Sequence, residues 1–174
     1  LDAQYRMHPM LGTFVSDQFY APYGEAFDSP SPASDFAHTL PGYAGPAAWL
    51  NVHHRHGSEL KGQSKSRPAE ALAIATELKR LMDSQEGRDL SFGIISFYAA
   101  QRDSINVELE KVGIAERDEG GSTEILPPYK ELLDKNGRIV ERLRNGTADA
   151  FQGMEFDVVF LSMVRSNKLP DKTE

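Results

Sequence analysis

The chain has 174 residues, of which 40% are hydrophobic and 26% are charged, and its formal net charge is −7. This composition is typical of a globular domain or lobe and excludes wholesale disorder. The negative charge argues against binding of nucleic acid through an overall positive field, but it leaves a local basic groove open. There is no cysteine, no signal peptide and no apolar run of membrane-spanning length, so disulfides and zinc–thiolate sites are excluded. We therefore expect a soluble intracellular protein, cytoplasmic or nuclear.

The first 52 residues combine one predicted helix with a long irregular segment. Apolar residues from Met10 to Tyr20 follow a helical period, and Pro9 before them suits a first helical turn. Residues 21–46 are rich in Pro, Gly, Ser and Asp, which predicts a long connection without regular structure. The apolar stretch AAWLNV, residues 47–52, is expected to form a short buried strand.

The remainder of the chain alternates helices with strands. Helical periodicity over 68–82 and again over 98–112 predicts two helices, separated by the strand-like run SFGIISF at 91–97. A further strand is expected at 139–148, and DVVFLSMV at 157–164 is typical of a central parallel strand. This order predicts an α/β fold with a mainly parallel sheet flanked by helices.

Residues 113–137 separate the second helix of this series from the strand at 139–148. They are predicted to be a variable insertion in which Tyr129 to Asp134 could form a short helix. Together with 21–46 they make two insertion-like segments in a single expected domain over residues 1–174.

Polar side chains gather next to the predicted strand ends. The segment SFYAAQR, residues 96–102, follows one strand, and TADAFQGMEFD, residues 147–157, precedes the last. Ligands of such α/β sheets bind at the carboxyl ends of the strands. The amide of Gln152, the backbone of Gly153 and the carboxylate of Glu155 together suit a nucleotide. A polar turn between strands, with Gly supplying a positive φ, explains the same residues equally well.

Three motifs in this order carry a resemblance to a known family. QYRMHP at 4–9, ISFYAAQR at 95–102 and TADAFQGMEFDVVFLSMVRSN at 147–167 resemble the second RecA-like domain of superfamily 1 helicases, in the branch of the up-frameshift and senataxin-like enzymes. The resemblance covers essentially the whole chain. It implies a lobe of the RecA-like P-loop NTPase fold and an enzyme that couples ATP hydrolysis to movement along single-stranded DNA or RNA.

The resemblance assigns QYR to the ATP cleft. It implies that Tyr5 stacks on adenine and that Arg6 reaches the γ-phosphate, with Gln4 beside them. A guanidinium suits this task because its planar fork matches phosphate oxygens and gains most where charge builds up in phosphoryl transfer. A salt bridge at the lobe surface is the alternative role for Arg6. His8 is expected to be structural, because a histidine beside a helix start most often caps or packs.

The fifth helicase motif is matched by residues with both nucleotide and nucleic-acid roles. The resemblance implies γ-phosphate contacts for Gln152 and Gly153, so that Gln152 joins Arg6 as a catalytic candidate, and a ribose contact for Glu155. Thr147 and Asp149 are implied to lie on the nucleic-acid side.

The fourth helicase motif is matched by four residues: Ser96, Tyr98, Gln101 and Arg102. The resemblance also places Ser96, Tyr98 and Gln101 on the nucleic-acid side. Phe97 stands where the family usually has Pro, and we expect it to pack in the core, although an exposed Phe could stack on a base. Arg165 is expected to orient loops beside the cleft.

Basic residues and histidines outside the three motifs suggest two further roles. Arg142 and Arg144 are candidates for phosphate contacts, and the alternative is that their strand directs them into solvent. The triplet His53, His54 and His56 could bind zinc, but a solvated loop is favoured because no carboxylate pair or cysteine completes a site.

No GxxxxGK[ST] motif occurs in the sequence, so the phosphate-binding loop and its lysine are missing. We expect a first RecA-like lobe of the same parent chain to supply them and to hold Mg²⁺ for ATP, which leaves this fragment alone inactive. The alternative is a lobe of a regulatory or defence ATPase that uses ATP as a conformational switch and does not unwind. Neither backbone contacts nor base stacking distinguishes DNA from RNA unless a group contacts the 2′-hydroxyl.

Overall fold

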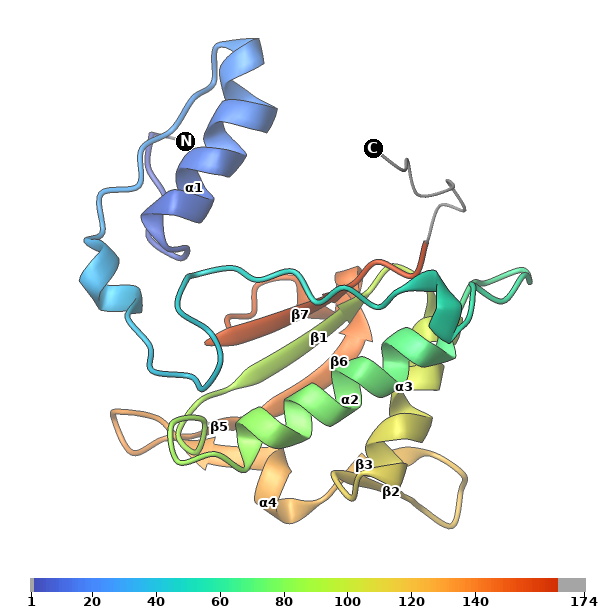
Figure 1. Ribbon diagram of the computed structural model, residues 1–174. Coiled ribbons are helices and arrows are strands. Elements are labelled where there is room, and N and C mark those ends of the chain that lie inside the picture. The colour runs from blue at the N-terminus through green and yellow to red at the C-terminus, as the bar shows by residue number, and fades with distance from the viewer. Residues whose placement is uncertain (1, 166–174) are drawn as a thin grey trace. The chain divides into compact units, whose positions relative to one another are not determined.

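Residues 2–165 are described in a computed structural model, shown in Figure 1. They divide between Leu50 and Asn51 into two compact units, each of which is described by itself. In this part of the chain no helix has the length and apolar character needed to cross a membrane.

The first unit contains the helix predicted after QYRMHP. Helix α1, Pro9–Val15, begins at a proline, and His8 Nδ1 accepts a hydrogen bond from Met10 N at 3.1 Å. This contact caps the helix, as expected for a structural His8. The helix continues as a π-helical turn, Ser16–Tyr20, which confirms the predicted extent but not its regular winding.

The rest of the first unit is irregular, as predicted. Its only regular pieces within the described residues are 3-10 turns at Ala21–Tyr23 and Ala33–Phe36. The predicted strand at 47–52 is wrong, because this segment is not paired with any strand described and Trp49 is 79% exposed. A strand requires a neighbour for its backbone groups, and an apolar run of six residues does not specify one.

The second unit is built on a parallel three-stranded sheet. Strand β1, Phe92–Ser96, lies between β6, Leu143–Thr147, and β7, Val158–Ser162. The register places Ser96 beside Thr147 on one side and Ser162 on the other, so three hydroxyl side chains meet at the carboxyl ends of the strands.

One face of the sheet is covered by α2, Pro68–Met82, and α3, Ala99–Lys111. Figure 1 shows both helices beside the strands. Asn145 of β6 donates to Arg102 O in α3 at 2.9 Å, and Ser162 of β7 donates to Glu70 of α2 at 2.8 Å. Side chains alternate between the two faces along each strand. Asn145, Ser162 and every second residue from them along their strands therefore face α2 and α3. The predicted α/β class is confirmed.

The position of β7 differs from the prediction. It forms the edge of the sheet among the described residues, and β1 is central. Val159 and Leu161, which alternate with the residues facing the helices, are exposed, Leu161 at 59%. A continuous apolar run predicts burial on both faces but does not reveal how many strands stand beside it.

The insertion between α3 and β6 contains short elements. A hairpin joins β2, Ala115–Arg117, to β3, Thr123–Ile125, and helix α4, Pro127–Lys130, precedes a second hairpin of β4, Glu131–Leu133, with β5, Ile139–Glu141. The short helix therefore lies earlier than the predicted 129–134, because Pro127 and Pro128 suit a first helical turn.

The strand expected at 139–148 is divided into β5 and β6, which pair with different partners.

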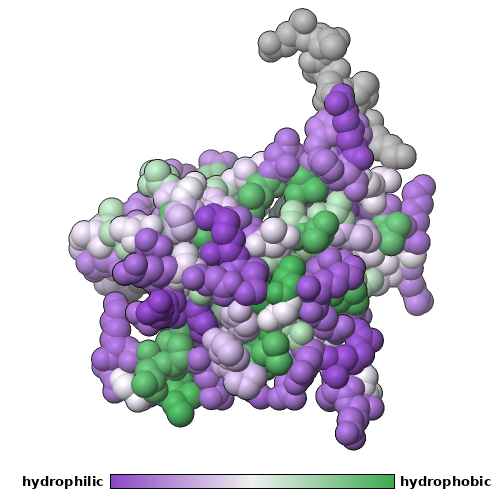
Figure 2. Space-filling model, turned by 60° about the horizontal axis from the view of Figure 1, so that its bottom comes forward, coloured by the Kyte–Doolittle hydropathy of each residue, from purple (hydrophilic) through white to green (hydrophobic). Residues whose placement is uncertain are grey.

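On the face of the molecule shown in Figure 2, hydrophobic residues form separate patches in a largely hydrophilic surface. This face therefore lacks a broad apolar area.

Candidate nucleotide and nucleic-acid site

The QYR segment forms a turn that Gln4 holds from inside. Gln4 Oε1 accepts hydrogen bonds from the backbone N of Arg6 at 3.0 Å and of Met7 at 2.8 Å. Gln4 Nε2 donates to Met7 O at 3.1 Å and to Ser29 Oγ at 2.8 Å. The turn consequently directs Tyr5 and Arg6 outward, and Tyr5 is 68% exposed.

Gln4 itself is buried, which corrects the predicted contact with the nucleotide. Both atoms of its amide are engaged within the first unit. Gly12 of α1 permits this arrangement, because a Cβ there would lie 2.1 Å from Ser29 Oγ and 2.5 Å from Gln4 Nε2. Gln4 is therefore a support for the turn that carries Tyr5 and Arg6.

Gln152 and Gly153 occupy the centre of a tight turn between β6 and β7. Gln152 has φ −59° and ψ 122°, Gly153 has φ 80°, and Met154 N donates to Phe151 O at 3.0 Å. These values describe a type II turn, in which the second central residue requires a positive φ and is usually Gly. Gln152 and Glu155 are exposed on either side of Met154.

The turn is fixed to the sheet by two aromatic rings. Phe151 and Phe156 pack edge to face, with centroids 5.5 Å apart. They lie over Gly93 of β1, where a Cβ would be 2.9 Å from Phe151 and 3.1 Å from Phe156, and Phe151 also lies over Gly146 of β6. The two glycines give the rings a flat surface on the face opposite the helices.

The same packing corrects the predicted place of this motif. The segment leaves the carboxyl end of β6 and crosses the sheet to the amino end of β7, where Asp157 Oδ2 accepts from Ser91 N at 2.8 Å. A short connection between parallel strands has to return along the sheet in this way. Gln152, Gly153 and Glu155 therefore lie along a face and not only at the sheet edge.

At the carboxyl ends of the strands, the structure buries two predicted nucleic-acid contacts. Gln101 is fully buried: its Oε1 accepts from Arg67 N at 2.7 Å and its Nε2 donates to Ser162 Oγ at 3.0 Å. Ser96 is also fully buried, and its Oγ has no hydrogen-bond partner among residues 2–165. Both predictions are corrected, because neither side chain reaches the surface.

Other residues of these motifs remain accessible. Asp149 is exposed and Thr147 and Tyr98 are half-buried. Phe97 is 58% exposed, which overturns the predicted core packing. Phe97 directly follows β1, and Thr147 is the last residue of the adjacent β6, so both lie at the carboxyl edge of the sheet.

Arg142 is buried, which corrects its predicted phosphate contact. Its guanidinium donates to the carbonyl oxygens of Pro128 at 2.7 Å, Met82 at 2.9 Å and Gly87 at 3.2 Å. Burial lowers the pKa of this guanidinium. Arg144 donates to Glu141 at 2.7 Å and to Ala150 O at 3.0 Å, which holds the start of the crossing segment.

Replacing Arg142 with alanine is expected to lower the free energy of unfolding by about 3 kcal/mol, because three carbonyl groups, two of them in buried contacts, lose their donor. Urea denaturation of the chain measures this change. Arg138→Ala is a matched control, because Arg138 is exposed and forms a surface ion pair with Asp134, and surface pairs contribute up to about 1 kcal/mol. Equal stabilities of the two variants would contradict a supporting role for Arg142.

The histidine loop is organised by backbone contacts. The rings of His53 and His54 lie 4.1 Å apart, and His53 Nδ1 accepts from Arg55 N at 3.1 Å. Among the described residues, no group of three or more His, Cys, Asp or Glu side chains is placed to hold a metal ion.

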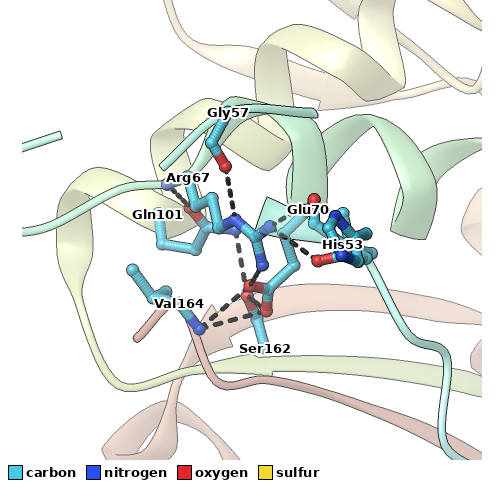
Figure 3. Close-up of polar contacts among 8 residues, drawn as sticks. His53, Gly57, Arg67, Glu70, Gln101, Ser162 and Val164 are labelled. Carbon is cyan, nitrogen blue, oxygen red and sulfur yellow. Dashed lines mark hydrogen bonds and ion pairs between the residues drawn. The ribbon is translucent and has the colours of Figure 1, made fainter. Parts of the chain in front are cut away.

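The sequence motifs did not identify the pair Arg67 and Glu70, which joins the start of α2 to the end of β7 (Figure 3). Arg67 is 5% exposed and Glu70 largely buried. Their i, i+3 spacing at the start of a predicted helix was the available signal, since two opposite charges so placed face the same side. Arg165 lies just beyond β7, whereas Ser166 and Asn167, the last residues of the third motif, lie outside the described residues.

Comparison with known proteins identifies the family. A family model described as an AAA domain matches residues 1–173, nearly the whole sequence. A search of curated proteins found no match. The parallel sheet with flanking helices agrees with this assignment. The chain therefore belongs to this AAA domain family, whose members carry a helicase-like ATPase domain of the RecA type.

Proposed function

We propose that this chain is the second RecA-like lobe of an ATP-dependent superfamily 1 helicase or translocase, in the up-frameshift and senataxin-like branch. The observation that carries the proposal is the turn at residues 4–7, where a buried Gln4 directs Tyr5 and Arg6 outward. An exposed aromatic ring next to an exposed guanidinium suits a purine nucleotide, since the ring stacks on the base and the guanidinium binds phosphate oxygens.

The second unit, taken by itself, contains polar groups of the kind that a nucleotide requires. Gln152 is exposed at the centre of a turn that Phe151 and Phe156 fix to the sheet, and Glu155 follows it. We assign Gln152 and the backbone of Gly153 to the γ-phosphate and Glu155 to the ribose. A turn fixed by packing supports such a role, because charge stabilisation in phosphoryl transfer depends on preorganised groups.

The carboxyl edge of the sheet supports the assignment of single-stranded nucleic acid as the second ligand. Phe97 is exposed there as a stacking surface, between Tyr98 and Ser96, and Ser96 is the residue that pairs with Thr147. Base stacking on aromatic side chains is tolerant of sequence, as translocation along a strand requires. Asp149 is assigned to the same side, whereas Ser96 and Gln101 support this edge from beneath.

The proposed partner is a first RecA-like lobe with a Walker loop and Mg²⁺ ligands, in a longer protein that we call the two-lobe protein. The 174 residues contain no GxxxxGK[ST] motif, so the lysine and the metal site have to come from that lobe. ATP would then bind between the two lobes and contact residues of each.

The chain alone is therefore expected to hydrolyse ATP no faster than a buffer blank, with or without single-stranded DNA or RNA. Phosphate release by the purified chain measures this rate. The two-lobe protein, which also contains the first lobe, is expected to hydrolyse ATP in the same assay. Nucleic-acid-stimulated hydrolysis by the chain alone would contradict the division of the site between two lobes. A forked duplex assay separates unwinding from an ATP switch that does not unwind.

A further inference from the structure

The backbone at Val164 is strained. Val164 has φ 63°, and it is the only residue other than Gly with a positive φ in the described part of the chain. Arg165 N donates to Met163 O at 2.6 Å, so an i to i+2 hydrogen bond closes around Val164. This combination is a γ-turn of the rare, strained form, and a β-branched side chain disfavours positive φ further.

The turn follows β7, and its side chains alternate between exposed and buried positions. Val164 is fully buried, whereas Met163 and Arg165 are exposed on either side of it. A Gly would adopt this conformation without strain. The strained conformation therefore persists because other contacts hold it, and strain of this kind is concentrated at functional sites.

Glu70 makes the contact that holds Val164. Val164 N lies 3.1 Å from both carboxylate oxygens of Glu70, and Ser162 Oγ donates to Glu70 Oε1 at 2.8 Å. Hydrogen bonds to an ionised acceptor are stronger than those between neutral groups. One largely buried carboxylate thus binds the last residue of β7 and the strained residue two positions later.

Arg67 fixes this carboxylate in turn. The Arg67 guanidinium lies 3.9 Å from Glu70, and it also donates to Val52 O at 2.6 Å, Gly57 O at 3.0 Å and His53 O at 3.1 Å. Figure 3 shows these contacts between the start of α2, the histidine loop and the end of β7. The positions of Arg67 and Glu70 are therefore fixed by contacts with three segments of the second unit: the start of α2, the loop of residues 52–57 and the end of β7.

Gln101 closes the network from α3. Its side chain joins Arg67 N to Ser162 Oγ, so that the matched fourth motif and the end of β7 share one set of buried polar contacts. Buried networks in which each member is bonded favour a single arrangement of their parts.

We propose that Glu70 is a positioning residue, which holds the γ-turn at Val164 and thereby sets the direction in which Arg165 leaves the carboxyl end of β7. The functional part of this inference rests on the proposed function and on the expectation from the sequence that Arg165 orients the loops beside the ATP cleft. Glu70 acts through the backbone of Val164 and contacts neither ATP nor nucleic acid.

The backbone part is tested by amide hydrogen exchange in the 174-residue chain. Glu70→Ala is expected to accelerate exchange at Val164 N about tenfold, because a buried donor loses its acceptor. Glu77→Ala is the matched control: Glu77 lies on the same helix, and its carboxylate accepts from Arg80. Should Glu70→Ala unfold, Glu70→Gln retains one acceptor oxygen and is expected to give a smaller acceleration. Unchanged exchange at Val164 in the folded variants would overturn the proposal.

The functional part is tested by ATP turnover in the two-lobe protein. Glu70→Ala is expected to lower kcat about tenfold with KM unchanged. The reason is that Arg165, and the loops that it orients, would no longer be aligned for the chemical step. Adding Arg165→Ala should cause no further loss, and adding Val164→Gly should restore most of kcat, because Gly adopts the turn without Glu70. A purely structural Glu70 would instead give additive losses and a worse Val164→Gly double variant, which would overturn the proposal.

These measurements separate the two claims. A wild-type two-lobe protein without nucleic-acid-stimulated turnover would refute the proposed function, and the exchange at Val164 would still decide whether Glu70 holds the turn.

Discussion

Replacing Arg6 with alanine in the two-lobe protein is expected to lower kcat for ATP hydrolysis by about 10², whereas affinity for ATP falls much less. The reason is that charge on the γ-phosphoryl group builds up in the transition state, where a preorganised guanidinium contributes most. Arg6 is suited to this role because the Gln4 amide binds its backbone N and fixes the turn that carries it. Steady-state phosphate release and nucleotide binding, measured on the same variant, separate the two effects.

Two control variants make the Arg6 result specific. Arg6→Lys should rescue poorly, because an ammonium keeps the charge but lacks the planar fork. Arg117→Ala should leave kcat unchanged, since Arg117 is an exposed arginine of the insertion and is paired with Glu110 of α3. Near wild-type turnover of Arg6→Ala would instead assign Arg6 to a surface salt bridge.

The second large effect is expected at Glu155. Glu155→Ala in the two-lobe protein should raise KM for ATP about tenfold, because hydrogen bonds of a charged acceptor to ribose hydroxyls are lost. Nucleic-acid affinity without nucleotide should be unchanged, because a carboxylate repels phosphates and is not expected to contact them. Steady-state kinetics and titration of a labelled single strand at several salt concentrations measure both quantities.

Glu116→Ala is the matched control for Glu155, because it removes an exposed carboxylate from β2, outside the candidate site. It should alter neither KM nor strand binding. If Glu155→Ala weakened nucleotide-free binding of the strand and left KM unchanged, the nucleotide and nucleic-acid sides of the motif would be assigned backwards.

The parts of the fold that sequence predicted are those governed by local periodicity. Helix α2 has its apolar residues at helical spacing and Pro68 at its first position, and β1 is a short apolar run ending before a polar loop. Both signals lie within the element itself. The predicted strand at 47–52 failed because pairing depends on a neighbour elsewhere in the chain, and the edge position of β7 was hidden for the same reason.

The candidate site shows the same limit at the level of side chains. The sequence located the motifs, and the turn at Gln152 and Gly153 followed from the conformational freedom of Gly. It did not reveal that Gln4, Gln101 and Arg142 point inward, because a polar side chain is buried wherever its hydrogen bonds are satisfied by partners distant in sequence. Gln101, for example, binds residues 34 and 61 positions away.

The central claim, that this chain is one lobe of a nucleic-acid-dependent ATPase, is tested most directly by ATP turnover of the two-lobe protein with and without single-stranded nucleic acid. The proposal predicts that single-stranded DNA or RNA raises kcat, and that Arg6→Ala removes most of the stimulated rate. Parallel titrations with both polymers identify the preferred one. Turnover that neither polymer changes, or that Arg6→Ala leaves intact, would contradict the claim.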